Sequence, residues 1–206
     1  MKFPFFASFI VFCLWLTFML HRQRNKEARV HKSFWDQEAA ANRTRRQSLE
    51  GLDYIQIPFD ALPMEALTED PAIAECHETL RTLSENPIVN FTGISNTDLK
   101  LKYGAPNIDI LSRYDQSYTV LVRTLQKMAE TLYQKGYVAE ACQVLEFSVK
   151  TGTDISASYK LLATIYLEMD TPDKISGLLP IVKGLNTSLS GRIAAMLEEF
   201  LAKSAG

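Results

Sequence analysis

Cysteine and histidine are scarce in this sequence. Its 206 residues include three cysteines, at positions 13, 76 and 142, and three histidines. The cysteines are far apart and form no paired motif, so they indicate neither a disulfide framework nor a zinc site. Cys76 and His77 are neighbours, but adjacent residues on a helix do not face each other and therefore cannot form a catalytic thiolate pair.

Motifs that carry catalysis are also absent. The sequence has no Gly-rich phosphate loop, no H-E-x-x-H and no G-x-S-x-G, the patterns that hold phosphates, zinc ions and nucleophilic serines. We therefore predict that the protein is not an enzyme. We expect no catalytic residue, no metal, no cofactor and no small-molecule substrate.

Positive charge is scarce over most of the chain. Residues 47–206 carry 13 basic and 21 acidic side chains, a net charge of −8. Nucleic-acid binding depends on lysines and arginines that replace phosphate counterions, so this composition argues against a nucleic-acid partner. Residues 21–46 differ, because eight basic side chains stand there against three acidic ones, a net charge of +5. A basic segment thus precedes an acidic body.

One long apolar run stands near the start of the chain. Residues 3–20 contain no charged side chain, and a helix of that length measures about 27 Å, close to the thickness of a hydrocarbon core. A cleaved signal peptide would have a shorter apolar region that ends in small residues, whereas this run ends in Phe18, Met19 and Leu20. We therefore predict an uncleaved signal anchor, a single-pass transmembrane helix at residues 1–21.

The charges beside this run predict its orientation. Five basic residues follow it closely, and they are predicted to lie at the membrane surface: Arg22, Arg24, Lys26, Arg29 and Lys32. By the positive-inside rule the soluble domain is then cytoplasmic. Residues 22–50 are expected to form a basic juxtamembrane helix, which lies on the anionic leaflet, or a solvated stalk.

Residues 51–110 combine an extended segment, a helix and irregular loops. Ile55, Ile57 and Phe59 alternate with other residues while Pro58 removes a backbone donor, so this segment cannot be a central strand. We expect it to dock its apolar side chains on a helical domain. A further hypothesis is that residues 54–62 occupy that domain's own groove.

The same region contains one clear helix signal. Asp70 followed by Pro71 is typical of a helix start, and the helix should end near Asn86, before Pro87. Residues 87–107 contain several prolines and glycines and predict short pieces without an assigned role. Within them, Lys100, Lys102 and Tyr103 are more typical of a solvated loop than of a ligand site.

The C-terminal part of the chain repeats itself at a fixed interval. Four apolar columns keep this spacing: Leu125, Tyr159 and Ile193; Met128, Leu162 and Met196; Ala129, Ala163 and Leu197; Leu132, Tyr166 and Phe200. The interval is about 34 residues, a length that indicates stacked helix pairs that bury their apolar faces against one another. Such stacks bind partners more often than they catalyse reactions.

These columns resemble the tetratricopeptide repeat (TPR). The positions that carry the resemblance are predicted to pack the repeat: Leu125, Met128, Ala129, Leu132, Gly136 and Ala141 in the first unit, and Tyr159, Leu162, Ala163 and Tyr166 in the second. The second unit departs from the pattern, because Asp170 replaces the turn glycine and Ile175 the usual alanine. The resemblance implies binding of a peptide or protein in a concave groove.

The sequence thus predicts an all-α protein with an N-terminal transmembrane helix, followed by TPR-like repeats and a capping helix at residues 111–206. Its expected function is that of a membrane-tethered adaptor or scaffold that binds an unknown protein or peptide. Two alternatives remain. One is a structural subunit of a membrane assembly, and the other is an extracytoplasmic repeat protein with an uncleaved signal anchor.

Overall fold

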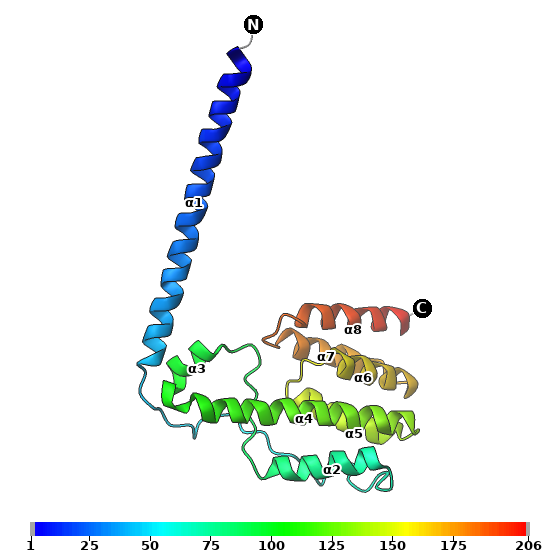
Figure 1. The fold of residues 1–206 in the computed structure, drawn as a ribbon. Helices are drawn as coiled ribbons and strands as arrows, with labels where there is room; N and C mark the ends of the chain where they lie inside the picture. The colour runs from blue at the N-terminus through cyan, green and yellow to red at the C-terminus, as the bar shows by residue number, and fades with distance from the viewer. Residues whose placement is uncertain (1–2, 205–206) are drawn as a thin grey trace. The chain divides into compact units, whose positions relative to one another are not determined.

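A computed structural model describes residues 3–204, and the side chains of residues 8–24 and 31–203 within them. The helices in chain order are α1 (Phe3–Asn42), α2 (Pro71–Ser84), α3 (Asn96–Tyr103), the 3-10 helix η1 (Ala105–Asn107), α4 (Ile108–Gln134), α5 (Val138–Lys150), α6 (Ser156–Glu168), α7 (Asp173–Lys183) and α8 (Ser190–Ser204) (Figure 1). Residues 3–204 contain no β-strand beyond one isolated bridge, between Tyr54 and Val89. The all-α prediction is confirmed.

The predicted transmembrane helix at residues 1–21 is wrong. Over the residues that the structure describes, no helix offers a stretch both long enough and apolar enough to cross a bilayer. The side chains of residues 3–7 lie outside the described set. Three further predictions depended on this transmembrane helix and are also wrong: the signal anchor, the single-pass membrane localisation and the membrane tether.

The chain divides into two compact units. Residues 3–47 and 96–107 form unit 1, and residues 48–95 and 108–204 form unit 2. Unit 1 contains α1, α3 and η1, with α3 packed on α1. A carboxylate of α1, Glu38, accepts hydrogen bonds from Thr97 (2.6 Å) and from the ammonium group of Lys100. Because these bonds favour the ionised form, the Lys100 contact above all, the pKa of Glu38 is lowered.

A buried asparagine completes unit 1. The side chain of Asn107 is 1% exposed, and its amide donates to the carbonyl oxygens of Gln47 and Tyr103, both at 2.8 Å. Its Oδ1 atom accepts from Nε of Arg46 at 2.9 Å. Residues 96–107, which the sequence predicts only as short pieces, are therefore anchored on the C-terminal end of α1.

Unit 2 is a stack of helices. In it α2 packs on α4, α4 on α5, α5 on α6, and α6 on both α7 and α8, while α7 also packs on α8 (Figure 1). Each helix pair thus contacts the next pair, an arrangement compatible with a helical repeat. The core runs through all six helices, and Leu125, Tyr159 and Leu162 are among its largest fully buried side chains.

The backbone repeats as the sequence does. At the end of α4 the amide of Tyr137 donates to the carbonyl of Leu132 (2.9 Å), and at the end of α6 the amide of Thr171 donates to that of Tyr166 (2.8 Å). Each of these bonds closes a Schellman motif, which satisfies carbonyl groups that a helix end leaves without partners. The two motifs are separated by one full period of the sequence repeat.

The start of α2 is as predicted. The Asp70 side chain caps it by accepting from the amide of Ala72 at 2.9 Å, and Pro71 occupies the first helical position. The pKa of Asp70 is lowered, first by this backbone hydrogen bond and then by Lys135. The helix ends at Ser84, slightly before the predicted end at Asn86.

Candidate functional site

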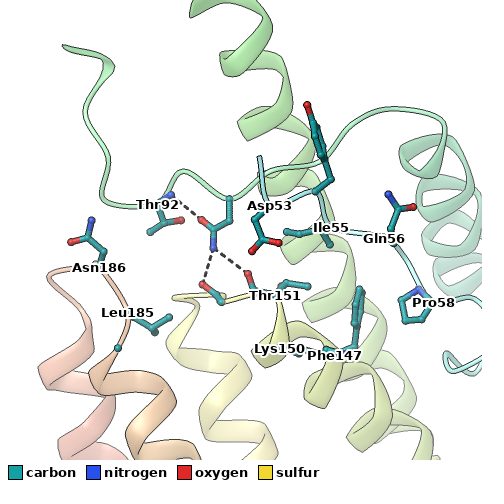
Figure 2. A pocket seen from close by; sticks show the side chains of 14 residues that line it. Asp53, Ile55, Gln56, Pro58, Thr92, Phe147, Lys150, Thr151, Leu185 and Asn186 are labelled. Atoms are coloured by element: carbon teal, nitrogen blue, oxygen red, sulfur yellow. Dashed lines mark hydrogen bonds between the residues drawn. The ribbon is translucent and has the colours of Figure 1, made fainter. Parts of the chain in front are cut away.

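A cavity of about 690 Å³ lies in unit 2 where the ends of several helices meet. We call it the turn cavity. The segment 53–58 forms one wall, the end of α5 and the turn after it form the second, and the connection from α7 to α8 forms the third (Figure 2). Its lining residues are Asp53, Tyr54, Ile55, Gln56, Pro58, Asn90, Thr92, Phe147, Lys150, Thr151, Gly152, Gly184, Leu185 and Asn186.

Asn90 holds the turn after α5. Its Nδ2 atom donates to the carbonyl oxygens of Thr151 (3.1 Å) and Gly152 (3.2 Å), and its Oδ1 atom accepts from the amide of Thr92 (2.8 Å) (Figure 2). Gly152 has a φ of +78°, the left-handed conformation that ends a helix and turns its carbonyl groups outward. Asn90 therefore satisfies carbonyl groups that would otherwise face the cavity unpaired.

Asn186 fastens the same loop to the next turn of the stack. Its Nδ2 atom donates to the carbonyl oxygen of Gly93 at 2.9 Å. Gly93 has a φ of +77°, and a Cβ atom built on it would stand 1.8 Å from the backbone oxygen of Asn186. Only glycine permits so close an approach. Loop 90–93 is thus held by two turns of the helical stack.

The wall at residues 53–58 is held by backbone pairing and by the core. The amide of Ile55 donates to the carbonyl of Ile88 at 2.9 Å. Ile57 and Leu62 are buried in the core of unit 2, and Phe59 packs against it. These side chains of the segment therefore lie against the helices of unit 2. Residues 53–58 form one wall of the turn cavity and leave it open, so a role as its occupant finds no support here.

The cavity holds two charged side chains. Asp53 and Lys150 are both exposed, and they belong to different walls. Two further carboxylates are held by residues next to the lining: Asp115 accepts from the amide of Phe91 at 3.3 Å, and Asp154 accepts from the hydroxyl of Thr187 at 3.1 Å. The surroundings of the cavity are therefore predominantly acidic.

The predicted repeat-packing residues lie in the core of unit 2. Nine of the ten are buried: Leu125, Met128, Ala129, Leu132, Ala141, Tyr159, Leu162, Ala163 and Tyr166. The tenth, Gly136, lies in the exposed turn after α4 with a φ of +84°. None of the ten is among the residues that line the turn cavity. Their role is to build the stack that positions the turns.

The five predicted membrane-surface residues belong to α1. Arg22, Arg24 and Lys32 are exposed, and the side chains of Lys26 and Arg29 lie outside the described residues.

Farther along the chain, the two lysines of the predicted solvated loop have partners in unit 1. Lys100 pairs with Glu38, and the ammonium group of Lys102 lies 5.2 Å from the ring centre of Tyr103.

A second polar cluster joins α5, α6 and α7. Oε1 of Glu146 accepts from the hydroxyl of Tyr166 (2.9 Å) and from Nζ of Lys174 (3.2 Å), and the thiol of Cys142 lies 3.7 Å away. Burial, followed by the charge of Glu146, raises the pKa of Cys142 to about 11. This thiol stays protonated at neutral pH and is a poor nucleophile. The cluster connects helices and shows no catalytic arrangement.

The sequence did not reveal Asn90, Gly93 or Asn186 as site residues. Asn90 acts on the distant turn after α5, and Asn186 acts on Gly93, in a loop that precedes the whole repeat. Periodicity and local turn signals report only on near neighbours, so they do not register such contacts.

Among the residues that the structure describes, no group of three or more His, Cys, Asp or Glu side chains is placed to hold a metal ion. No family model, curated protein or solved structure matches the chain.

Proposed function

We propose that unit 2 is a TPR-like module that binds an extended peptide segment of a partner protein in the turn cavity, without catalysis. The observation that carries this proposal is the cavity itself, an open space of about 690 Å³ between turns at the helix ends of the stack. Its size falls within the range of ligand-binding pockets, about 300–1,000 Å³.

The lining suits a peptide. Ile55, Phe147 and Leu185 offer apolar surface on three different walls, while Gln56 and Thr92 add polar groups (Figure 2). A peptide needs both, because its side chains gain from leaving water and its backbone must keep hydrogen-bond partners. The lining contains no histidine and no cysteine, and Asp53 is its only carboxylate. This composition supports binding more than acid–base or nucleophilic chemistry.

The TPR-like assignment is supported by the sequence period and by the two Schellman motifs that recur with that period. Small buried residues at equivalent positions, Ala129 and Ala163, let neighbouring helices approach closely. The proposal departs from the family expectation in one respect. It assigns the ligand to the turns between helices and not to the concave face of the stack.

A cavity-filling variant tests the proposal. Gln56→Trp adds a large side chain to an exposed lining position, and Glu65→Trp makes the same kind of change at an exposed position outside the cavity. A phage-displayed library of random 12-residue peptides is selected on the wild-type protein and on both variants. We expect enriched peptides on the wild type and on Glu65→Trp but not on Gln56→Trp, with equal thermal stability of all three. Equal enrichment on Gln56→Trp would refute the proposal, as would no enrichment on any of them.

A further inference from the structure

The charge of the cavity walls indicates which peptides they attract. Residues 48–95 carry nine acidic side chains and a single basic one, Arg81. The acidic residues are Glu50, Asp53, Asp60, Glu65, Glu69, Asp70, Glu75, Glu78 and Glu85. This stretch supplies seven of the lining residues of the turn cavity, from Asp53 to Thr92. One wall and loop 90–93 therefore belong to the most acidic part of the chain.

Some of these charges are balanced within unit 2. Glu75 pairs with Lys127 at 2.5 Å, and Asp70 pairs with Lys135 at 3.4 Å. Both of these pairs lie away from the cavity lining. Most of the others are exposed to solvent: Glu50, Asp53, Asp60, Glu65, Glu69 and Glu85. Over unit 2 as a whole, 20 acidic side chains stand against 11 basic ones, a net charge of −9.

The negative field reaches the cavity. Asp53 lines it directly. Tyr54 lines it too, and its pKa is raised first by burial, then by Tyr114 and by the charge of Glu50. Asp115 and Asp154 add two carboxylates beside the lining, whereas Lys150 is the only cation among the lining residues. A cationic ligand is favoured by such a field, and an anionic one is repelled.

From this complementarity we infer that the occupant of the turn cavity is a Lys- or Arg-containing extended peptide of a partner protein, with one cationic side chain placed at Asp53. The inference rests on the proposed peptide-binding function and adds the class of ligand. Asp53 is the specificity-determining residue, because it is the only lining group that can accept hydrogen bonds from an ammonium or guanidinium group and also balance its charge.

Three charge-biased peptide libraries test the inference. Each displays random 12-residue peptides on phage, with three fixed positions that are Lys or Arg in the first library, Glu in the second and Gln in the third. We expect enrichment of the first library on the full chain, and weaker binding of its recovered peptides as salt is raised from low to high concentration, since screening reduces surface attraction. Enrichment of the Glu or Gln library to the same degree would overturn the inference.

Matched charge variants test whether the cationic peptides bind at Asp53. Asp53→Asn and Asp60→Asn both remove one negative charge from exposed positions of the same segment, but only Asp53 lines the cavity. We expect Asp53→Asn to weaken binding of the recovered cationic peptides about two- to fivefold, the range for an exposed ion pair, and Lys150→Gln to strengthen it. Asp60→Asn should change binding less. Equal effects of both Asp variants would overturn the role of Asp53.

The two proposals fail in different ways. If Glu- or Gln-containing peptides bind and Gln56→Trp blocks them, the cavity is a peptide site and only the inferred charge is wrong. If cationic peptides bind equally well to Gln56→Trp, the acidic surface attracts them outside the cavity, and both proposals are refuted. Self-association of the chain that Asp53→Asn abolishes would identify a basic segment of a second copy as the occupant, against the inferred partner protein.

Discussion

Gly136 and Asp170 occupy equivalent positions in the two repeats and share a left-handed backbone conformation. Their φ angles are +84° and +54°, and one repeat period separates them. The amide of Gly136 donates to the carbonyl of Tyr133 (3.0 Å), and that of Asp170 donates to the carbonyl of Leu167 (3.1 Å). The repeat therefore requires the same turn in both units, although only one unit has the residue that adopts it without strain.

This relationship predicts that Asp170→Gly stabilises the protein. Glycine removes the steric cost of the left-handed conformation and also an acidic charge at the C-terminal end of α6, where the helix dipole disfavours it. We expect the free energy of unfolding to rise by about 0.5–1 kcal/mol, measured by urea denaturation. Asp170→Asn, which keeps a side chain tolerated in this conformation, should give a smaller gain. A loss of stability on Asp170→Gly would contradict the assignment.

A comparison of Gly→Ala changes at two positions distinguishes the cost of backbone conformation from the cost of packing. A Cβ atom would meet no other atom within 4 Å at either Gly136 or Gly177, but only Gly136 has a positive φ, because Gly177 lies within α7. Gly136→Ala should therefore cost about 1 kcal/mol, whereas Gly177→Ala should stabilise by about 0.5–1 kcal/mol. Both values are measured by urea denaturation. Changes of the same sign would show that conformation at position 136 is not the limiting factor.

The helices of unit 2 could be predicted from sequence because their signals are local. The apolar columns of the repeat, the Asp70 cap and the glycine turns each report on near neighbours or on a regular period. Asp170 was predicted to take the place of the turn glycine, and it does so. The position of loop 90–93 could not be predicted, since its partners at Gly152 and Asn186 are distant in sequence and depend on how the stack assembles.

The apolar run of α1 shows how a correct local pattern misleads. Residues 3–20 are uncharged, and the helix predicted there exists, but it is one continuous α1 that runs on to Asn42. Within the described part of the chain, no helix is long and apolar enough to cross a membrane. The prediction rested on the uncharged run, the absence of a cleavage site after it and the basic residues that follow it. The turn cavity could not be predicted because its lining residues share no pattern in the sequence.

Gly93 is predicted to be essential for the cavity wall. Gly93→Ala would place a Cβ atom against the backbone oxygen of Asn186 in a conformation that side chains rarely adopt. Loop 90–93 must then move away from the turn, with a loss of about 2 kcal/mol or more and loss of peptide binding. Gly51→Ala is the control, because its Cβ atom would meet open space. Unfolding curves and peptide selection measure the two effects, and an unchanged Gly93→Ala protein would refute the described approach of the two segments.

Asn107 is predicted to stabilise unit 1 locally. Asn107→Ala would remove the side-chain donor to the carbonyl oxygens of Gln47 and Tyr103, although the Tyr103 carbonyl still accepts from the amide of Gln47 at 3.0 Å, and we expect a cost of about 1–3 kcal/mol. Hydrogen exchange should become faster in residues 43–47 and 96–107 and stay unchanged in α4 to α8. Asn42→Ala, at an exposed amide that accepts from Lys100 at 2.9 Å, serves as control and should have a smaller effect. Uniformly faster exchange along the chain would contradict a local role.

The buried side chain of His77 is expected to make the stability of the protein depend on pH. The side chain is 3% exposed, and its Nε2 atom has no hydrogen-bond partner. Burial, followed by the charge of Arg81, lowers the pKa of His77 below its usual value of 6.5. The folded protein therefore keeps His77 neutral at pH values where the unfolded chain already binds a proton, so acidification favours unfolding.

The direction of the pKa shift of His77 determines the pH range in which stability should fall. Well above pH 6.5 both states hold His77 neutral and its titration has no effect. As pH falls below 6.5, the unfolded state gains a proton and stability drops, by at most about 1.4 kcal/mol per pH unit, until the lowered folded pKa is passed. Unfolding free energies at pH 7.5, 6.5 and 5.5 measure the loss. His77→Leu fills a similar volume without a titrating group, so it should remove this part of the pH dependence while keeping stability at pH 7.5. An equal decline in His77→Leu would assign the pH dependence to other groups.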